Sequence, residues 1–132
     1  MPTPTFEVLV ADDDTDICNL LSEYFRTRGL SCKTHPDGRS AVRALAASGG
    51  HYHLVVTDIG MPGADGFEVL AASRAANPNG HTVMMTGMTL PDTETRAVLA
   101  GADTFLTKPF TLAQMDVVVA QAAERFASRP AI

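Results

Sequence analysis

The sequence predicts an α/β fold built on one open parallel sheet of five strands, with helices packed on both faces. The main observation is alternation, because five short runs rich in apolar and β-branched residues are each followed by a segment with helical periodicity. Parallel strands joined by right-handed crossovers form a doubly wound sheet, for which the strand order 2-1-3-4-5 is a common arrangement. The length of 132 residues suits a single domain with its own core.

The first half of the chain supplies three predicted strands, at residues 6–11, 31–35 and 53–57. A helix is predicted over 14–28, because apolar residues recur at helical spacing until Gly29. Its apolar stripe consists of Ile17, Leu20, Leu21, Tyr24 and Phe25. Asp37 is expected to cap a second helix, which ends at the glycine pair 49–50.

The second half begins with a loop rich in glycine and proline over 59–66, followed by a helix at 67–76 and a strand at 81–86. Pro91 is expected in the first turn of a fourth helix, which Gly101 ends. A fifth strand is predicted over 103–107, and a capping box of Thr111 and Gln114 opens the last helix. We therefore expect one domain over 1–132, with a core at about 6–126 and short flexible tails.

Composition and charge disfavour several classes of protein. Acidic residues outnumber basic ones, 15 to 10, which gives a net charge of −5. No basic run is present, so direct nucleic-acid binding is not expected. The N-terminus does not resemble a signal peptide, and no apolar run reaches the ~20 residues that a membrane span needs. The sequence therefore predicts a soluble, cytoplasmic protein without membrane contact.

Cysteine and histidine are too sparse to form a crosslinked or metal-bound scaffold. Cys18 and Cys32 cannot supply a disulfide framework or a four-ligand zinc site, and we expect them to be small buried residues. The four histidines lack metal-binding spacing and are expected at the surface or at strand edges.

Polar side chains follow four of the five predicted strands. Asp12 and Asp13 follow the first strand, Asp58 the third, Thr86 ends the fourth, and Lys108 follows the fifth. The carboxyl ends of parallel strands share one edge of the sheet, where ligand sites form near the switch in strand order. These side chains are therefore expected to meet in one pocket.

The chemistry of this set points to phosphoryl transfer. Clustered carboxylates repel one another, and a hard divalent cation with oxygen ligands offsets the repulsion. A cation and Lys108 could neutralise phosphoryl oxygens while an aspartate attacks phosphorus. Each residue alone has a plainer explanation: Asp14 suits a helix N-cap, and Asp58 a loop start. The joint occurrence of these residues at four strand ends favours a site.

The sequence resembles the receiver domain of bacterial two-component response regulators over about residues 6–126. Residues 8–14 (VLVADDD) are similar to the acidic end of the family's first strand, and residues 58–66 (DIGMPGADG) to its phosphoacceptor loop. Thr86 and Gly87 match the switch hydroxyl and its small neighbour. Residues 101–110 (GADTFLTKPF) resemble the final strand with its lysine. The resemblance implies a flavodoxin-like, or CheY-like, (βα)5 fold.

The resemblance also implies a role for each matching residue. Asp58 is expected to accept a phosphoryl group from a phosphohistidine on a sensor histidine kinase or a histidine phosphotransfer protein. Asp13, Asp58 and the backbone carbonyl of Gly60 are expected to bind Mg²⁺ or Mn²⁺, with Asp12 acting through a bound water. Lys108 is expected to contact the phosphoryl oxygens and to precede Pro109 in a cis peptide bond.

A conformational switch is part of the same expectation. Thr86 is expected to move toward the phosphoryl group and Phe105 to turn inward behind it. The surface of the fourth helix, fifth strand and fifth helix, including Arg96 and Thr107, would then control a downstream protein or a second copy of the chain. The only enzymology implied is phosphoryl transfer to the domain itself and slow self-dephosphorylation.

Two other functions fit less well. A phosphatase resembling the haloacid dehalogenases would use Asp12 as nucleophile with Asp14 behind it, but Asp16 stands where that motif needs a hydroxyl or valine. A flavodoxin-like FMN carrier needs a hydroxyl-rich phosphate loop after the first strand. Three consecutive aspartates there would repel the phosphate.

Overall fold

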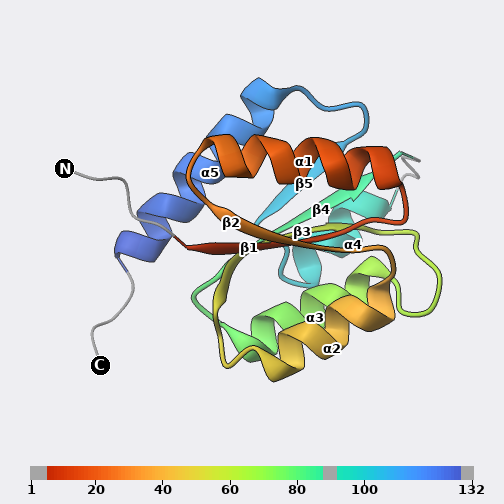
Figure 1. Ribbon diagram of the computed structural model, residues 1–132. Coiled ribbons are helices and arrows are strands. Elements are labelled where there is room, and N and C mark those ends of the chain that lie inside the picture. The colour runs from red at the N-terminus through yellow and green to blue at the C-terminus, as the bar shows by residue number, and fades with distance from the viewer. Residues whose placement is uncertain (1–5, 88–91, 129–132) are drawn as a thin grey trace.

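The computed structural model, which describes residues 6–87 and 92–128, is a five-stranded parallel sheet covered by helices on both faces (Figure 1). The strand order is β2-β1-β3-β4-β5, as predicted. The strands are β1 (Glu7–Ala11), β2 (Ser31–His35), β3 (Tyr52–Asp58), β4 (His81–Thr86) and β5 (Thr104–Thr107). The helices are α1 (Thr15–Thr27), α2 (Gly38–Ala47), α3 (Gly66–Ala76), α4 (Thr93–Leu99) and α5 (Leu112–Ala127).

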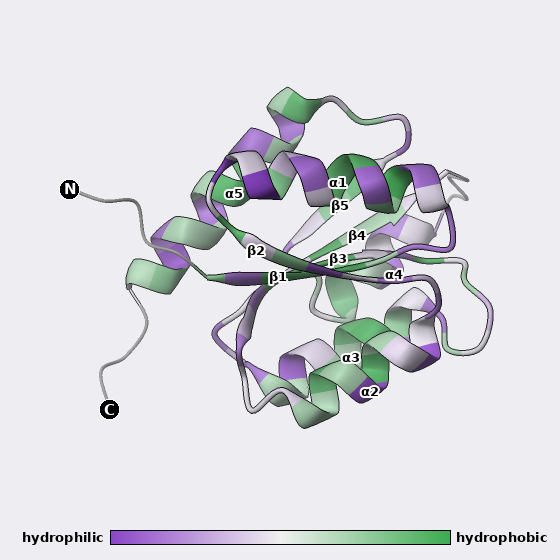
Figure 2. Ribbon diagram, in the orientation of Figure 1, coloured by the Kyte–Doolittle hydropathy of each residue, from purple (hydrophilic) through white to green (hydrophobic). Residues whose placement is uncertain are grey.

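The two faces of the sheet carry separate cores, because successive side chains of a strand point to opposite faces. Val8 and Val10 of β1 pack with the cluster under α1 and α5, whereas Leu9 and Ala11 pack with the cluster under α2 and α3. A smaller cluster around Met84 lies under α3 and α4. Figure 2 shows helices with both hydrophilic and hydrophobic residues beside largely hydrophobic inner strands. The sheet is therefore buried on both sides, as parallel sheets require.

Four helices begin with a side-chain cap and one does not. The carboxylates of Asp14, Asp37 and Asp65 each accept a backbone N–H from the first turn of α1, α2 and α3. The predicted capping box of Thr111 and Gln114 opens α5. Helix α4 spans only Thr93–Leu99, and the Asp92 side chain makes no capping hydrogen bond. Pro91, expected in its first turn, lies outside the described residues.

Gly101 follows the end of α4 with a φ of +104°, which confirms the prediction that this glycine ends the helix. The structure corrects two other sequence predictions. Strand β5 begins at Thr104 rather than at Asp103, whose carboxylate instead accepts the N–H of Thr82. His81 is buried in the interior strand β4, where its ring nitrogen lies 2.9 Å from the Thr104 hydroxyl. The prediction of an exposed or edge position is therefore wrong for this histidine.

Both cysteines are free, and Cys18 is buried whereas Cys32 is partly buried. Among the described residues, no helix combines the length and the apolar character needed to cross a membrane.

Candidate functional site

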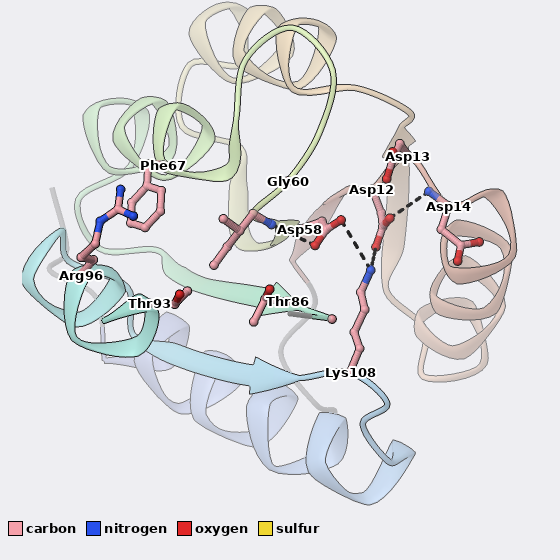
Figure 3. A pocket seen from close by; sticks show the side chains of 12 residues that line it. Asp12, Asp13, Asp14, Asp58, Gly60, Phe67, Thr86, Thr93, Arg96 and Lys108 are labelled. Atoms are coloured by element: carbon pink, nitrogen blue, oxygen red, sulfur yellow. Dashed lines mark hydrogen bonds and ion pairs between the residues drawn. The ribbon is translucent and has the colours of Figure 1, made fainter. Parts of the chain in front are cut away.

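The carboxyl ends of β1, β3, β4 and β5 open into one pocket of about 450 Å³ (Figure 3). The predicted acids, hydroxyl and lysine all line it. The lining residues are Asp12, Asp13, Asp14, Asp58, Ile59, Gly60, Phe67, Thr86, Gly87, Thr93, Arg96 and Lys108. The sheet therefore brings together side chains that lie up to 96 residues apart in the sequence.

A buried ion pair forms the floor of the pocket at the acidic end. The Asp12 side chain is fully buried, and its Oδ2 accepts a hydrogen bond from Lys108 Nζ at 2.6 Å. Its other oxygen accepts the backbone N–H of Asp14 at 2.9 Å. Burial disfavours the Lys108 ammonium, but the hydrogen bond to Asp12 and the charges of Asp12 and Asp58 outweigh it, so the pKa of Lys108 is raised. Lys108 is therefore a fixed positive charge in the site.

Asp58 lies at the end of β3, where its carboxylate faces the pocket. Lys108 Nζ is 3.6 Å from Asp58 Oδ2, and the N–H of Ile59 donates to Oδ1 at 3.0 Å. Burial raises the pKa of Asp58; Lys108 opposes that rise and the Asp12 carboxylate adds to it. Asp58 is thus partly desolvated but still reachable from the pocket.

Helix α3 packs so closely on β3 that only glycine fits at its first position. A Cβ on Gly66 would lie 2.3 Å from the Asp58 carbonyl oxygen, far inside van der Waals contact. The Gly66 N–H also donates to the Ile59 carbonyl oxygen at 2.8 Å. These contacts hold the turn that carries Ile59 and Gly60 beside Asp58.

Three aspartates could together hold a cation. One carboxylate oxygen from each of Asp12, Asp13 and Asp58 lies within 4.8 Å of the other two, and Asp13 is exposed to solvent. Oxygen ligands on a partly open site suit a hard divalent cation. Lys108 alone balances this group, which leaves a surplus of negative charge that such a cation would offset.

The hydroxyl and aromatic residues predicted to form a switch lie on neighbouring strands. Thr86 ends β4 with a buried side chain, and its carbonyl oxygen accepts the Lys108 N–H at 2.7 Å. Phe105 of β5 is half-buried against the cluster that contains Met84 and Ala97. The Lys108–Pro109 peptide bond is cis.

The opposite wall of the pocket contains residues that the sequence did not place in the site. Arg96 was expected only on the distant signalling surface, yet it lines the pocket with Thr93 of α4 and Phe67 of α3. The Arg96 guanidinium carbon lies 4.6 Å from the centre of the Phe67 ring. Neither residue belongs to a local motif, because their contact depends on how α3 and α4 pack.

Comparison with known proteins agrees with this geometry. The family model "Response regulator receiver domain" matches residues 8–120. Among curated relatives, the transcriptional regulatory protein RprY of Bacteroides fragilis is 33% identical over 108 residues, which cover 82% of this chain and 45% of that protein. The chain spans less than half the length of the curated relatives it matches.

Solved structures show the same fold. The receiver domain of a Francisella response regulator is 28% identical, with a TM-score of 0.80 over 91% of this chain and 98% of that one. A CheY-like receiver domain protein from Methanospirillum hungatei shares the fold at 20% identity, with a TM-score of 0.86 over 96% of this chain and all of that one. The chain belongs to the response regulator receiver domain family, whose members are signalling domains and not metabolic enzymes.

Proposed function

We propose that this domain is a switch that is turned on when Asp58 accepts a phosphoryl group. The donor is a phosphohistidine on a sensor histidine kinase or a histidine phosphotransfer protein. The observation that carries the proposal is the position of Asp58, whose partly desolvated carboxylate faces the pocket 3.6 Å from the Lys108 ammonium. The switch comprises the core of the domain, at about residues 6–126.

The transfer needs a nucleophile, and it needs positive charge beside the oxygens of the transferred phosphoryl group. An Asp58 oxygen forms a bond to phosphorus while the bond between phosphorus and the donor imidazole nitrogen breaks. The imidazole leaves with the electron pair, and it leaves as neutral histidine when its other ring nitrogen already holds a proton. The Lys108 ammonium, already 3.6 Å from Asp58, donates to a phosphoryl oxygen, and the hydroxyl of Thr86, which lines the same pocket, donates to another once Thr86 moves toward it.

The acidic cluster fits a Mg²⁺ or Mn²⁺ cofactor. Asp13, Asp58 and the backbone carbonyl of Gly60 would hold the ion, and Asp12, already bonded to Lys108, would contribute through a bound water. The ion, when bound, supplies positive charge beside the phosphoryl oxygens. Asp13 is the exposed member of the cluster and is therefore the ligand that can be changed with least effect on the core.

Phosphorylation is expected to change one face of the domain. When Thr86 moves toward the phosphoryl group, it leaves space that the half-buried Phe105 ring can fill. Complete burial of a phenylalanine contributes about 1.5–3 kcal/mol, which is enough to bias an equilibrium of that size. The α4, β5 and α5 surface bears the exposed apolar side chains Val98, Leu99 and Val117. A downstream protein or a second copy of the chain would bind there.

The geometry of the site favours Asp58 as the nucleophile over Asp12, which the phosphatase alternative would use. The Asp12 carboxylate is fully buried and both of its oxygens accept hydrogen bonds, from Lys108 and from the Asp14 N–H. A nucleophile in that position has no free oxygen with which to approach phosphorus. Once the phosphoryl group is on Asp58, slow self-dephosphorylation by water would return the domain to its resting state.

The direct test is to incubate the protein with acetyl phosphate and Mg²⁺ and to measure its intact mass. We expect one added phosphoryl group, which Asp58→Asn abolishes. The matched control is Asp65→Asn, which changes a nearby acid that caps α3 and does not line the pocket. Labelling of Asp58→Asn, or loss of labelling in Asp65→Asn alone, would contradict the assignment.

A further inference from the structure

The pocket has two positive charges, at opposite ends. Lys108 lies at the acidic end and Arg96 on the α4 wall, with Thr86 between them (Figure 3). They are the only basic residues among the described residues that line the pocket, which contains four aspartates. Lys108 is already engaged with Asp12 and Asp58.

The charge of Arg96 is not neutralised by an acid. Within residues 6–87 and 92–128, its guanidinium has no carboxylate within 4.0 Å and no hydrogen-bond partner. It lies instead over the face of the Phe67 ring, 4.6 Å from the ring centre. An aromatic face attracts a cation without cancelling its charge. The five N–H donors of the guanidinium therefore remain available to an anion.

Most other arginines in the described part of the chain are paired. Arg26, Arg28, Arg74 and Arg125 each form an ion pair with an aspartate or glutamate. Arg39 and Arg43 on α2 have no such pair, but neither lines the phosphoryl pocket. An unpaired arginine is thus not unusual in itself, and the position of Arg96 in the pocket wall is the distinguishing observation.

We propose that Arg96 is a second cationic residue of the phosphoryl pocket, which draws the anionic donor toward Asp58 and stabilises the phosphorylated form. The inference rests on the proposed function of Asp58. A phosphoryl group carries a charge of about −1.5 to −2 near neutral pH, in a pocket that already holds four carboxylates. An uncompensated cation in the same wall lowers the cost of bringing that charge in. Phe67 is the positioning residue that holds the guanidinium in the wall.

The reaction used as the test is phosphoryl transfer from acetyl phosphate. An Asp58 oxygen forms the bond to phosphorus, the bond from phosphorus to the acetyl oxygen breaks, and acetate leaves with the electron pair. Arg96 exchanges no proton and makes no covalent bond in this step. Its contribution is electrostatic and must therefore weaken as salt screens the charge.

The experiment compares the second-order rate constant of phosphorylation by acetyl phosphate, at saturating Mg²⁺, at low and at high ionic strength. Arg96→Gln is expected to lower the constant about threefold or more at low ionic strength, and less at high. Arg96→Lys is expected to restore most of the loss. Phe67→Leu, which keeps an apolar side chain but removes the ring, is expected to give an intermediate value.

Arg39→Gln is the matched control, because it removes the same charge from an exposed, unpaired arginine outside the pocket. It should leave the rate constant near the wild-type value. Equal rates for Arg96→Gln and Arg39→Gln, or a loss that salt does not reduce, would overturn the role of Arg96. If the wild-type protein labels on Asp58 in that case, the proposed function stands; if it does not label at all, both fail.

Discussion

The two edges of the sheet both contain charged groups, but the charges are balanced at only one of them. At the amino-terminal edge, the Asp103 carboxylate accepts from Arg125 at 2.7 Å and from the Thr82 N–H at 2.8 Å, with Arg74 at 4.0 Å. At the carboxyl-terminal edge, the carboxylates of Asp12, Asp13 and Asp58 lie close together, and the Lys108 ammonium forms ion pairs with only two of them, Asp12 and Asp58.

This difference separates a structural cluster from a functional one. A satisfied ion pair holds elements together, as Asp103 does for β4, α3 and α5. Surplus charge of one sign costs stability unless a ligand of the opposite sign binds, and perturbed groups of this kind gather at functional sites. The surplus negative charge at the carboxyl-terminal edge is what we expect of the cation site proposed above.

Removing the cation from each edge should give the largest contrast. Lys108→Met leaves the fully buried Asp12 carboxylate beside Asp58 with no counter-charge, and we expect the free energy of unfolding to fall by about 3 kcal/mol. Arg125→Met leaves Asp103 with Arg74 and the Thr82 N–H, in a more exposed pair, so a loss of about 1 kcal/mol or less is expected. Urea unfolding in EDTA measures both; equal losses would remove the distinction between the edges.

Neutralising an acid should change the free energy of unfolding in opposite directions at the two edges. Asp58→Asn relieves a buried surplus carboxylate and should raise the free energy of unfolding by about 1 kcal/mol. Asp103→Asn breaks ion pairs and should lower it by a similar amount. Because burial raises the pKa of Asp58 in the folded state, its destabilising effect is present at neutral pH and is lost as pH falls through that raised pKa. A destabilised Asp58→Asn would contradict the account.

Magnesium should stabilise the protein through the acidic edge alone. If the dissociation constant is about 1 mM, 10 mM Mg²⁺ raises the free energy of unfolding by about 1.4 kcal/mol. Asp13→Ala removes an exposed ligand and should abolish most of the gain, whereas Asp16→Ala, an exposed acid in the first turn of α1, should retain it. Thermal unfolding with and without Mg²⁺ provides the measurement; an equal response in Asp13→Ala would count against this site.

Lowering the pH should produce the smallest change in stability, through His81 near the amino-terminal edge of the sheet. Burial lowers the pKa of His81, so the folded state keeps it neutral while the unfolded state begins to bind a proton near pH 6.5. Its contribution to stability is therefore present above that pH and is lost as pH falls toward the lowered pKa. The test compares Asp58→Asn with the double variant that also carries His81→Gln, so that Asp58 does not titrate in either protein. Between pH 7.5 and pH 5.5, the free energy of unfolding should fall less in the double variant than in Asp58→Asn, by under about 1 kcal/mol. Identical losses would contradict this assignment.

The sequence was sufficient to predict the order of the strands and the edge at which the site forms. Alternating periodicity fixes which segments are strands, and the cap residues Asp14, Asp37 and Thr111 mark helix starts because their side chains bond to the next turn. The acids and Lys108 meet because parallel strands end at a common edge. These features depend on local pattern together with one topological rule.

The features that the sequence did not predict depend on tertiary packing. Helix α4 lacks a side-chain cap, so no capping hydrogen bond marks where it begins. His81 is buried because β4 has a neighbour on each side and Thr104 lies within hydrogen-bond distance. Arg96 reaches the pocket only because α4 packs beside Phe67 of α3. None of these contacts has a sequence spacing that would identify it.

The most direct test of the central claim is a comparison of amide NMR shifts before and after beryllofluoride is added with Mg²⁺, because this anion mimics the phosphoryl group on Asp58. We expect large shifts around residues 12–14 and 58–60 and also over residues 93–107, with residues 43–47 of α2 unchanged. Asp58→Asn should show no such response. Shifts confined to the loops around Asp13 and Asp58, with residues 93–107 unchanged, would contradict a switch in which an anion bound at Asp58 changes the conformation of α4 and β5.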